Sequence, residues 1–202
     1  MKNSLNRFVP KGFKPFVSSD YYKTLNIEVK PPVKRRKNKD IIFGSLSEII
    51  EKLNIKDGMT LSFHHHLRNG DYVMNDVLKE VFKEDIKNIT IAPSSIFPVH
   101  EPIVKYIKEE KITKIYTDYL NGPVAEAVQE GQLKELLIMQ THGGRPRAIE
   151  YGDLVIDVAF IAASCVDKLG NSSGKYGKSA FGSIGYAIPD ALYAKKVVII
   201  TD

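Results

Sequence analysis

Residues 59–92, MTLSFHHHLRNGDYVMNDVLKEVFKEDIKNITIA, contain the pattern that decides the fold. The apolar run 59–63 predicts a strand, and the apolar side chains between 73 and 82 recur at the spacing of one helix face. Asp71 is placed to cap that helix, and residues 88–92 predict a second strand. A strand, a helix and a second strand in this order form the βαβ unit of parallel sheets.

The same alternation extends in both directions from this unit. Upstream, a helix is expected at 46–53, with Ser45 or Ser47 as its cap and the Asp57-Gly58 turn behind it. Downstream, helices are expected at 99–110 and 123–131, and strands at 112–117, 136–140, 154–163 and 197–201. The sequence therefore predicts an α/β fold, a mainly parallel sheet with flanking helices. In such folds the loops that leave the carboxyl ends of the strands bind ligands.

The charge is unevenly distributed along the 202 residues. Residues 1–39 carry eleven Lys or Arg against two acidic side chains, whereas the remainder carries eighteen against twenty-two. We therefore predict a basic, proline-containing leader at 1–40 and an α/β domain at 41–202. The densest basic run, 34–39, lacks the interleaved aromatic side chains of a surface that stacks on nucleic acid. A solvated linker, or an arm that docks on an acidic partner chain, is favoured over nucleic-acid binding.

Composition excludes several other classes. No apolar run of about 18 residues occurs, and no apolar block follows the first seven residues, so neither a membrane segment nor a signal sequence is expected. We expect a cytoplasmic protein. The single cysteine, Cys165, excludes an internal disulfide and is interpreted as a small buried residue rather than a nucleophile. Because nothing follows the strand at 197–201, we also expect the domain to be truncated at its carboxyl end.

Three adjacent histidines, 64–66, follow the first predicted strand, with Arg68 close behind. Consecutive side chains of an extended segment point to opposite faces, so at most His64 and His66 converge, and no Cys or Glu follows at ligand spacing. We therefore expect no metal site. The segment is interpreted as a polar loop whose imidazoles and backbone N–H groups face an anionic substrate; the alternative is a surface loop without chemistry.

Residues 142–147, HGGRPR, are the next candidate. Gly143 and Gly144 let the backbone come close to a ligand, and the guanidinium groups of Arg145 and Arg147 suit a carboxylate or a phosphate. The alternative is a tight turn with two solvated arginines.

Three further loops carry weaker signals. Ser94 and Ser95 lack the glycines of a nucleophile elbow, so a turn or a helix cap is favoured, and residues 118–122 show only a turn signal. The stretch 170–179 contains Gly-Lys-Ser but not the glycine spacing or the following helix of a P-loop. It remains a glycine-rich loop with two lysines, suited to an anionic ligand or to a sharp chain reversal.

Several segments resemble one known family. Residues 58–73, GMTLSFHHHLRNGDYV, look like the signature of citrate lyase alpha subunits, and residues 141–149 and 152–160 are similar to two further blocks of that family. Residues 170–186 and 197–202 match as well. The resemblance runs from about residue 45 to the end, and residues 10–16 look like the family's opening segment.

The resemblance implies a fold related to the coenzyme A transferases, of which these residues form the first of two halves. It also implies a citrate:acetyl-carrier transferase, an enzyme of citrate metabolism. Citrate would displace acetate from an acetylated acyl carrier subunit, directly through a mixed anhydride, and the beta subunit would then cleave the citryl thioester. A related citramalate coenzyme A transferase and a non-catalytic ligand-binding or assembly fragment remain open alternatives.

The implied cofactors and partners lie outside the chain. No cofactor is bound by the chain itself, because the thioester is carried on a phosphoribosyl-dephospho-coenzyme A arm of the acyl carrier, or on coenzyme A as a substitute. The expected partners are the beta subunit, the acyl carrier (gamma) subunit, citrate, an acetyl thioester and further copies of the chain, which make a homo-oligomer.

The resemblance also organises the candidate site, although the catalytic group stays unassigned. Because the family's second half is absent, we expect these 202 residues alone to be inactive. We assign citrate and acyl binding to His64, His65, His66, Arg68, Gly143, Gly144, Arg145 and Arg147. We assign carrier or coenzyme A binding to Ser94, Ser95, Gly174, Lys175, Gly177 and Lys178.

Overall fold

The computed structural model describes residues 1–3, 6–14, 44–64 and 71–201. They belong to two units, one within residues 1–30 and one within residues 31–202. In the first unit, Lys2 and Phe8 form an isolated antiparallel bridge. The boundary predicted at residue 40 lies outside the described residues and stays a prediction.

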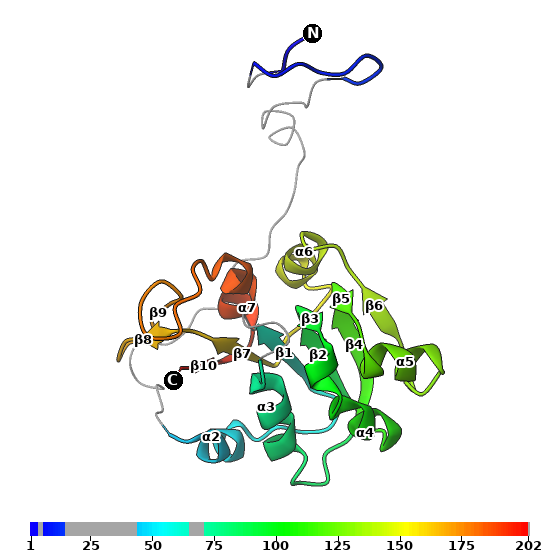
Figure 1. The fold of residues 1–202 in the computed structure, drawn as a ribbon. Coiled ribbons are helices and arrows are strands. Elements are labelled where there is room, and N and C mark those ends of the chain that lie inside the picture. The colour runs from blue at the N-terminus through cyan, green and yellow to red at the C-terminus, as the bar shows by residue number, and fades with distance from the viewer. Residues whose placement is uncertain (4–5, 15–43, 65–70, 202) are drawn as a thin grey trace. The chain divides into compact units, whose positions relative to one another are not determined.

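A six-stranded parallel sheet forms the centre of the second unit (Figure 1). Its order is β10-β7-β1-β2-β4-β6, and every neighbouring pair is parallel. All six carboxyl ends therefore lie at one edge, and the strand order changes direction between β1 and β7, where open α/β sheets bind ligands. The strands are β1 (Thr60–His64), β2 (Ile89–Pro93), β4 (Ile112–Thr117), β6 (Leu137–Met139), β7 (Val158–Ala162) and β10 (Lys196–Ile200).

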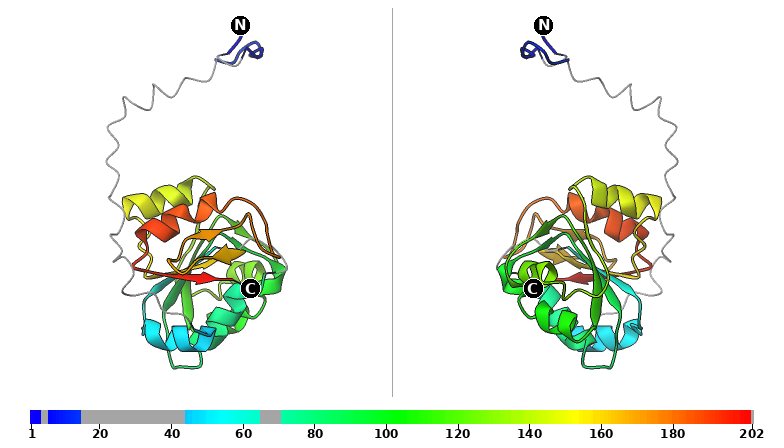
Figure 2. Two further views of the ribbon diagram at one scale, coloured as in Figure 1. Left: turned by 90° about the vertical axis from the view of Figure 1, so that its left-hand side faces the viewer. Right: turned by 90° about the vertical axis from the view of Figure 1, so that its right-hand side faces the viewer.

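Helices cover both faces of this sheet (Figures 1 and 2). One face carries α2 (Leu46–Leu53), α3 (Val73–Val81), α4 (Ile103–Lys108) and α5 (Pro123–Gln129). The other face carries α6 (Gly144–Tyr151) and α7 (Ile188–Tyr193), which lie side by side. The predicted α/β class and parallel sheet are confirmed.

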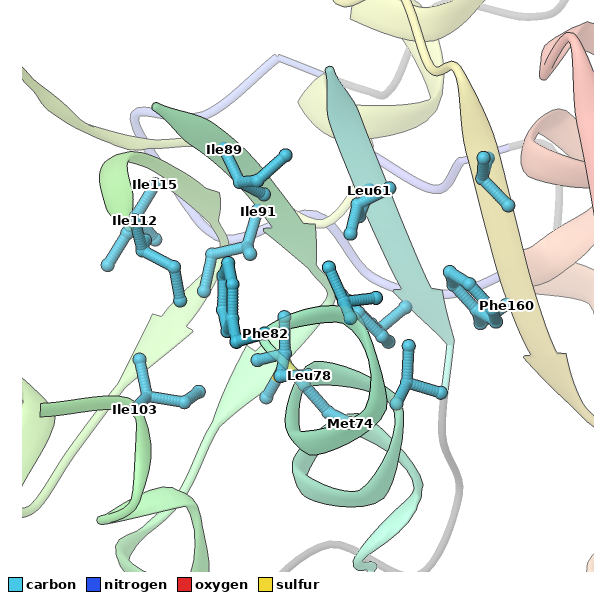
Figure 3. Close-up of a cluster of buried hydrophobic side chains, with 14 of the residues drawn as sticks. Leu61, Met74, Leu78, Phe82, Ile89, Ile91, Ile103, Ile112, Ile115 and Phe160 are labelled. Carbon is cyan, nitrogen blue, oxygen red and sulfur yellow. The ribbon is translucent and has the colours of Figure 1, made fainter. Parts of the chain in front are cut away.

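The strands divide their side chains between two cores. In β7, Val158 and Phe160 join the larger core, whereas Ala159 and Ile161 join the smaller core on the opposite face. This alternation follows from the two-residue repeat of a strand. Figure 3 shows the larger core, where Met74, Leu78 and Phe82 pack against apolar side chains of the sheet. Each such side chain contributes roughly 1.5–3 kcal/mol when it is fully buried.

The smaller core is rich in alanine. It contains alanines from β2, β7 and the helices, at positions 92, 148, 159, 187 and 194. Their short side chains let α6 and α7 lie close to the sheet, next to the carboxyl ends of the strands. The candidate site is built in this region.

Local signals explain the start of two helices. Ser45 caps α2: its hydroxyl accepts from the Glu48 N–H, and the Glu48 carboxylate accepts from the Ser45 N–H at 2.7 Å. The backbone and side-chain bonds from Ser45 hold the pKa of Glu48 below its usual value. Before α3, Asp71 Oδ1 accepts from the Val73 N–H at 2.9 Å. The prediction of Ser45 as a cap is confirmed, whereas the N-cap position of α3 is Tyr72, one residue after Asp71.

Three elements differ from the prediction. The helix expected at 99–110 is divided into the 3-10 helix η2 (Pro98–His100) and α4, because Pro102 has no N–H to donate. The strand expected from residue 154 begins at Val158. The segment 142–147, expected to be a loop, is helical from Gly144, whose N–H bonds to the hydroxyl and the carbonyl of Thr141.

Candidate functional site

Polar side chains gather where β1, β4 and β6 end beneath α6 and α7. Ser62 and His64 lie on the face of β1 opposite to Leu61 and Phe63, because side chains two positions apart share a face. Both polar residues are buried and face the smaller core and its helices. Two clusters of polar groups are built around this face.

The buried ion-pair cluster consists of Ser62, Arg145 and Asp190. Both Arg145 and Asp190 have no exposed side-chain surface. The guanidinium forms a bidentate pair, with Nη1 to Asp190 Oδ2 at 2.7 Å and Nη2 to Oδ1 at 2.7 Å. Nη2 also donates to Ser62 Oγ at 2.7 Å and to the Ala92 carbonyl at 2.9 Å, and Ser62 Oγ donates to Asp190.

This cluster ties four elements together, since its members come from β1, α6 and α7 and Arg145 also bonds to Ala92 of β2. Burial disfavours the charge of Arg145, but the attraction of Asp190 and the hydrogen bonds to it outweigh that effect and hold the guanidinium pKa above its usual value. The planar fork assigned to a citrate carboxylate is therefore occupied by an internal one. Arg145 is fully buried and bonds other parts of the chain in this arrangement, and its assignment to citrate stays a prediction.

The His142 cluster consists of Asp118, His142 and Tyr186. His142 Nδ1 lies 2.9 Å from Asp118 Oδ2, and the Tyr186 hydroxyl donates to the same oxygen at 3.2 Å. The His142 and Tyr186 rings stack with centroids 3.9 Å apart and planes at 8°. Asp118 is only 9% exposed, whereas the His142 side chain is 76% exposed.

Tyr186 joins the two clusters. Its ring lies over Arg145, with Cζ 5.6 Å from the ring centroid, and 5.3 Å from the His64 ring. Burial raises the pKa of the Tyr186 hydroxyl well above its usual value; Arg145 opposes the rise and Asp118 adds to it. The hydroxyl is therefore a stable donor to Asp118.

A groove of about 560 Å³ is lined by residues on either side of Tyr186 in the sequence, Gly185 and Ile188 among them. The antiparallel strands β8 (Cys165–Val166) and β9 (Ser172–Ser173) belong to the same stretch of chain, where β9 lines the groove and Gly174 bridges to Gly182. Gly177 has a φ of 94°, and a Cβ there would lie 2.3 Å from the Ser164 carbonyl oxygen, so only glycine fits. The groove is lined by Ser172, Ser173, Gly174, Lys175, Gly182, Ser183, Ile184, Gly185 and Ile188.

The structure separates the residues assigned to carrier binding. Gly174 and Lys175 line the groove, whereas Gly177 and Lys178 lie further along the same loop. Ser94 is buried, and its carbonyl accepts from the Asp118 N–H at 3.3 Å. Ser95 forms the short strand β3 (Ser95–Ile96), which pairs with β5 (Tyr119–Leu120). The two serines therefore support the turn that carries Asp118.

The residues assigned to citrate are also distributed over more than one place. Arg147 is exposed, forms an ion pair with Asp153 at 3.1 Å and lies over the Tyr151 ring. Gly143 has open space around its Cα, and Gly144 starts α6. His65, His66 and Arg68 lie outside the described residues. Within the described ranges no three His, Cys, Asp or Glu side chains gather to hold a metal ion.

Five residues of the two clusters, Ser62 among them, were missed by the sequence-based assignment. Asp118 directly follows β4, and His142 follows β6, so the rule on carboxyl ends of strands was a sufficient signal for both. Tyr186 and Asp190 carry no such local signal. In the part of the chain that the structure covers, no helix has the length and apolar character to cross a membrane.

Comparison with known proteins identifies similar chains. A sequence model of the family described as "Citrate lyase, alpha subunit (CitF)" matches residues 38–202. The citrate lyase alpha chain of Haemophilus influenzae is 47% identical over 158 residues, 78% of this chain and 32% of that protein. The Escherichia coli citrate lyase alpha chain is 44% identical over 159 residues, 79% of this chain and 31% of that protein.

A solved structure from Streptococcus mutans, described as an alpha subunit of citrate lyase in complex with citrate, matches with a TM-score of 0.80 and 44% identity. The match covers 100% of this chain and 40% of that one. This chain spans about a third of the length of the curated relatives it matches.

Proposed function

This chain belongs to the citrate lyase alpha subunit family, and we propose that it forms an acyl-transfer domain that exchanges acetate for citrate on a thioester. The observation that carries the proposal is the family match over residues 38–202, which spans both polar clusters and the groove. The thioester belongs to the arm of an acyl carrier subunit, a phosphoribosyl-dephospho-coenzyme A type group, or to coenzyme A itself.

The proposed exchange is balanced in two steps. A citrate carboxylate oxygen attacks the acetyl thioester carbonyl, and the carbon–sulfur bond breaks to release a thiolate and leave a mixed anhydride. The thiolate then attacks the citryl carbonyl of the anhydride, and acetate leaves. Both steps place negative charge on a carbonyl oxygen and on sulfur, so the site must supply hydrogen-bond donors and fixed positive charge.

The placement is proposed from the sequence assignments and from the rule that ligands bind at the carboxyl ends of parallel strands. Citrate binds among the His64–His66 loop, Arg68, Gly143 and Gly144, with Arg147 at the outer side of α6. The carrier arm lies along the groove, where the Gly174 backbone and Lys175 suit its phosphates. Arg145 positions α6 and α7 around both. The beta and acyl carrier subunits are the proposed partners, and the chain is proposed to assemble with further copies of itself.

The test is a chimera in which residues 38–202 replace the matching segment of the Haemophilus influenzae alpha chain. It is mixed with beta and carrier subunits, acetylated carrier and citrate, and carrier masses are followed by mass spectrometry. We expect citrate-dependent conversion of acetyl to citryl carrier. A chimera that folds, assembles and leaves the acetyl carrier unchanged, while the parent alpha chain is active, overturns the proposal.

Two alternatives are separated by the same assay. A citramalate transferase would convert acetyl carrier with citramalate and not with citrate. A non-catalytic assembly segment would support neither acid, although the chimera would still bind the other subunits.

A further inference from the structure

Among the described residues, the exposed ring of His142 is held by more neighbours than an ordinary surface histidine. Asp118 Oδ2 contacts Nδ1 at 2.9 Å, and the Tyr186 ring lies flat against the imidazole at 3.9 Å. Asp118 is in turn held by the Tyr186 hydroxyl and is 9% exposed. These contacts fix both the tilt of the ring and the nitrogen that points inward.

The consequence is that Nε2 is the nitrogen turned away from Asp118. A carboxylate at Nδ1 accepts the proton of that nitrogen and thereby sets the roles of the two ring atoms. In the imidazolium form both nitrogens donate, one to Asp118 and the other to a ligand. Within the described ranges Nε2 has no hydrogen-bond partner, and the side chain is 76% exposed.

The charged groups around His142 leave its Nε2 available to an anion. Arg145 and Asp190 neutralise each other in a bidentate pair, and both terminal guanidinium nitrogens of Arg145 donate inside the protein. Gly185, the residue before Tyr186 in the sequence, lines the groove together with Lys175. His142 therefore stacks on a tyrosine that also contacts Arg145 and that follows a groove-lining residue in the sequence.

We propose that His142 binds a carboxylate of the acid substrate through Nε2–H, and that Asp118 and Tyr186 hold the ring for this contact. The proposal deepens the proposed function and rests on it. It also fits the chemistry: a carboxylate nucleophile is already ionised at neutral pH, so the exchange needs no base to remove its proton. What the carboxylate needs is a donor that fixes the position of one oxygen while the other attacks.

The first experiment is citrate titration of the full 202-residue chain by calorimetry, comparing the parent with His142→Gln. Loss of one charge-assisted hydrogen bond predicts a citrate Kd raised about ten- to a hundredfold. Lys134→Gln is the matched control: it removes an exposed cation, paired with Glu110, before the amino end of β6, whereas His142 follows the carboxyl end. We expect its Kd within about twofold of the parent, because distant surface charges are largely screened.

Two further variants separate contact from general support. Tyr186→Phe keeps the ring stack and removes the hydroxyl, so we expect a citrate Kd raised by about two- to fivefold, less than for His142→Gln. Nitrogen-15 spectra of the histidine rings give a readout that folding alone does not move. Citrate should shift the Nε2 signal that is absent in His142→Gln, and Nδ1 should shift less.

The outcomes are distinguishable. If the parent binds citrate and His142→Gln binds it equally well, or if the His142 Nε2 signal stays unchanged at saturation, the assignment of His142 is wrong and the acyl-transfer function stands. If the parent chain binds no citrate while the chimera converts the carrier, the citrate contact lies outside this chain and the His142 assignment again fails. If neither binding nor conversion is seen, the proposed function fails as well.

Discussion

The buried ion-pair cluster and the His142 cluster pair a basic side chain with an aspartate at nearly the same distance, 2.7 and 2.9 Å. They differ in exposure: Arg145 and Asp190 are fully buried, whereas His142 is 76% exposed. A fully buried pair presents no exposed donor to a ligand, and its hydrogen bonds hold elements together. The exposed His142 ring is held by the buried Asp118 carboxylate and can still contact a ligand. Burial of the basic partner therefore decides which cluster serves the fold and which one serves a ligand.

The largest loss of stability is expected when the carboxylate of the buried pair is removed. Asp190→Asn leaves the Arg145 charge in a space without its counter-ion, which should lower the free energy of unfolding by about 3–5 kcal/mol. Urea unfolding of the parent and the variant measures it. A loss below about 1 kcal/mol would mean that water reaches Arg145 and that the contrast between the clusters does not hold.

The control for this prediction removes both charges. Arg145→Met combined with Asp190→Leu replaces the pair by apolar groups, and buried pairs replaced in this way are often tolerated. The double variant should therefore be more stable than Asp190→Asn alone.

A second prediction compares two arginines on one helix. Arg145→Lys keeps a charge but loses the fork that bonds Asp190, Ser62 and Ala92, so the free energy of unfolding should fall by about 2 kcal/mol. Arg147→Lys, at an exposed pair with Asp153, should change it by less than about 0.5 kcal/mol. Equal losses in the two variants, measured in the same urea series, would contradict the assigned difference in burial.

Within the His142 cluster the expected effect on stability is smaller. Asp118→Asn retains a side chain of the same shape but loses the charge that pairs with His142, and the free energy of unfolding should fall by about 1 kcal/mol. The citrate Kd should rise more than this stability change suggests, because the variant no longer fixes the ring. Chemical unfolding and citrate calorimetry on one preparation compare the two quantities. A variant that loses stability and keeps citrate affinity would mean that Asp118 stabilises the fold and does not contribute to citrate binding.

The smallest effect concerns the residue that the clusters share. Burial raises the pKa of Tyr186, so the native state holds this proton more tightly than the unfolded chain does. Its contribution is fully present below the unfolded pKa of about 10 and is lost as the pH rises through the higher native pKa. In an ultraviolet titration of the phenols, Tyr186→Phe should remove a component that ionises only at the alkaline end. If the variant instead lost a component that ionises at lower pH with the other phenols, Tyr186 would be an exposed residue.

Periodicity predicted most of the sheet because strands and helices are encoded by nearby residues. The βαβ unit around residues 59–92 and the cap at Ser45 were predictable in this way. Helix α6 was not, because Gly143, Gly144 and Pro146 read locally as a turn, although Pro146 falls in the first turn of the helix, where its missing N–H costs little.

The site was less predictable than the sheet. Asp118 and His142 follow strands, so their position at the sheet edge was available from the sequence. The burial of Arg145 was not, since it depends on Asp190, 45 residues away, and on Ser62, 83 residues away. Local spacing contains no information on which distant carboxylate a guanidinium will meet.

The alanines of the smaller core act as spacers that set the height of α6 and α7 above the sheet. Ala148 of α6 and Ala159 of β7 belong to the smaller core, between the helix that carries Arg145 and the sheet that carries Ser62. Each added methylene would lift the helices and lengthen bonds that now measure 2.7 Å. Evolutionary drift should therefore be asymmetric: aliphatic residues of the larger core can exchange with one another, while the alanine positions are confined to the smallest side chains. The small volume of the alanine side chains thus sets how closely Arg145 on α6 can approach Ser62 on β1.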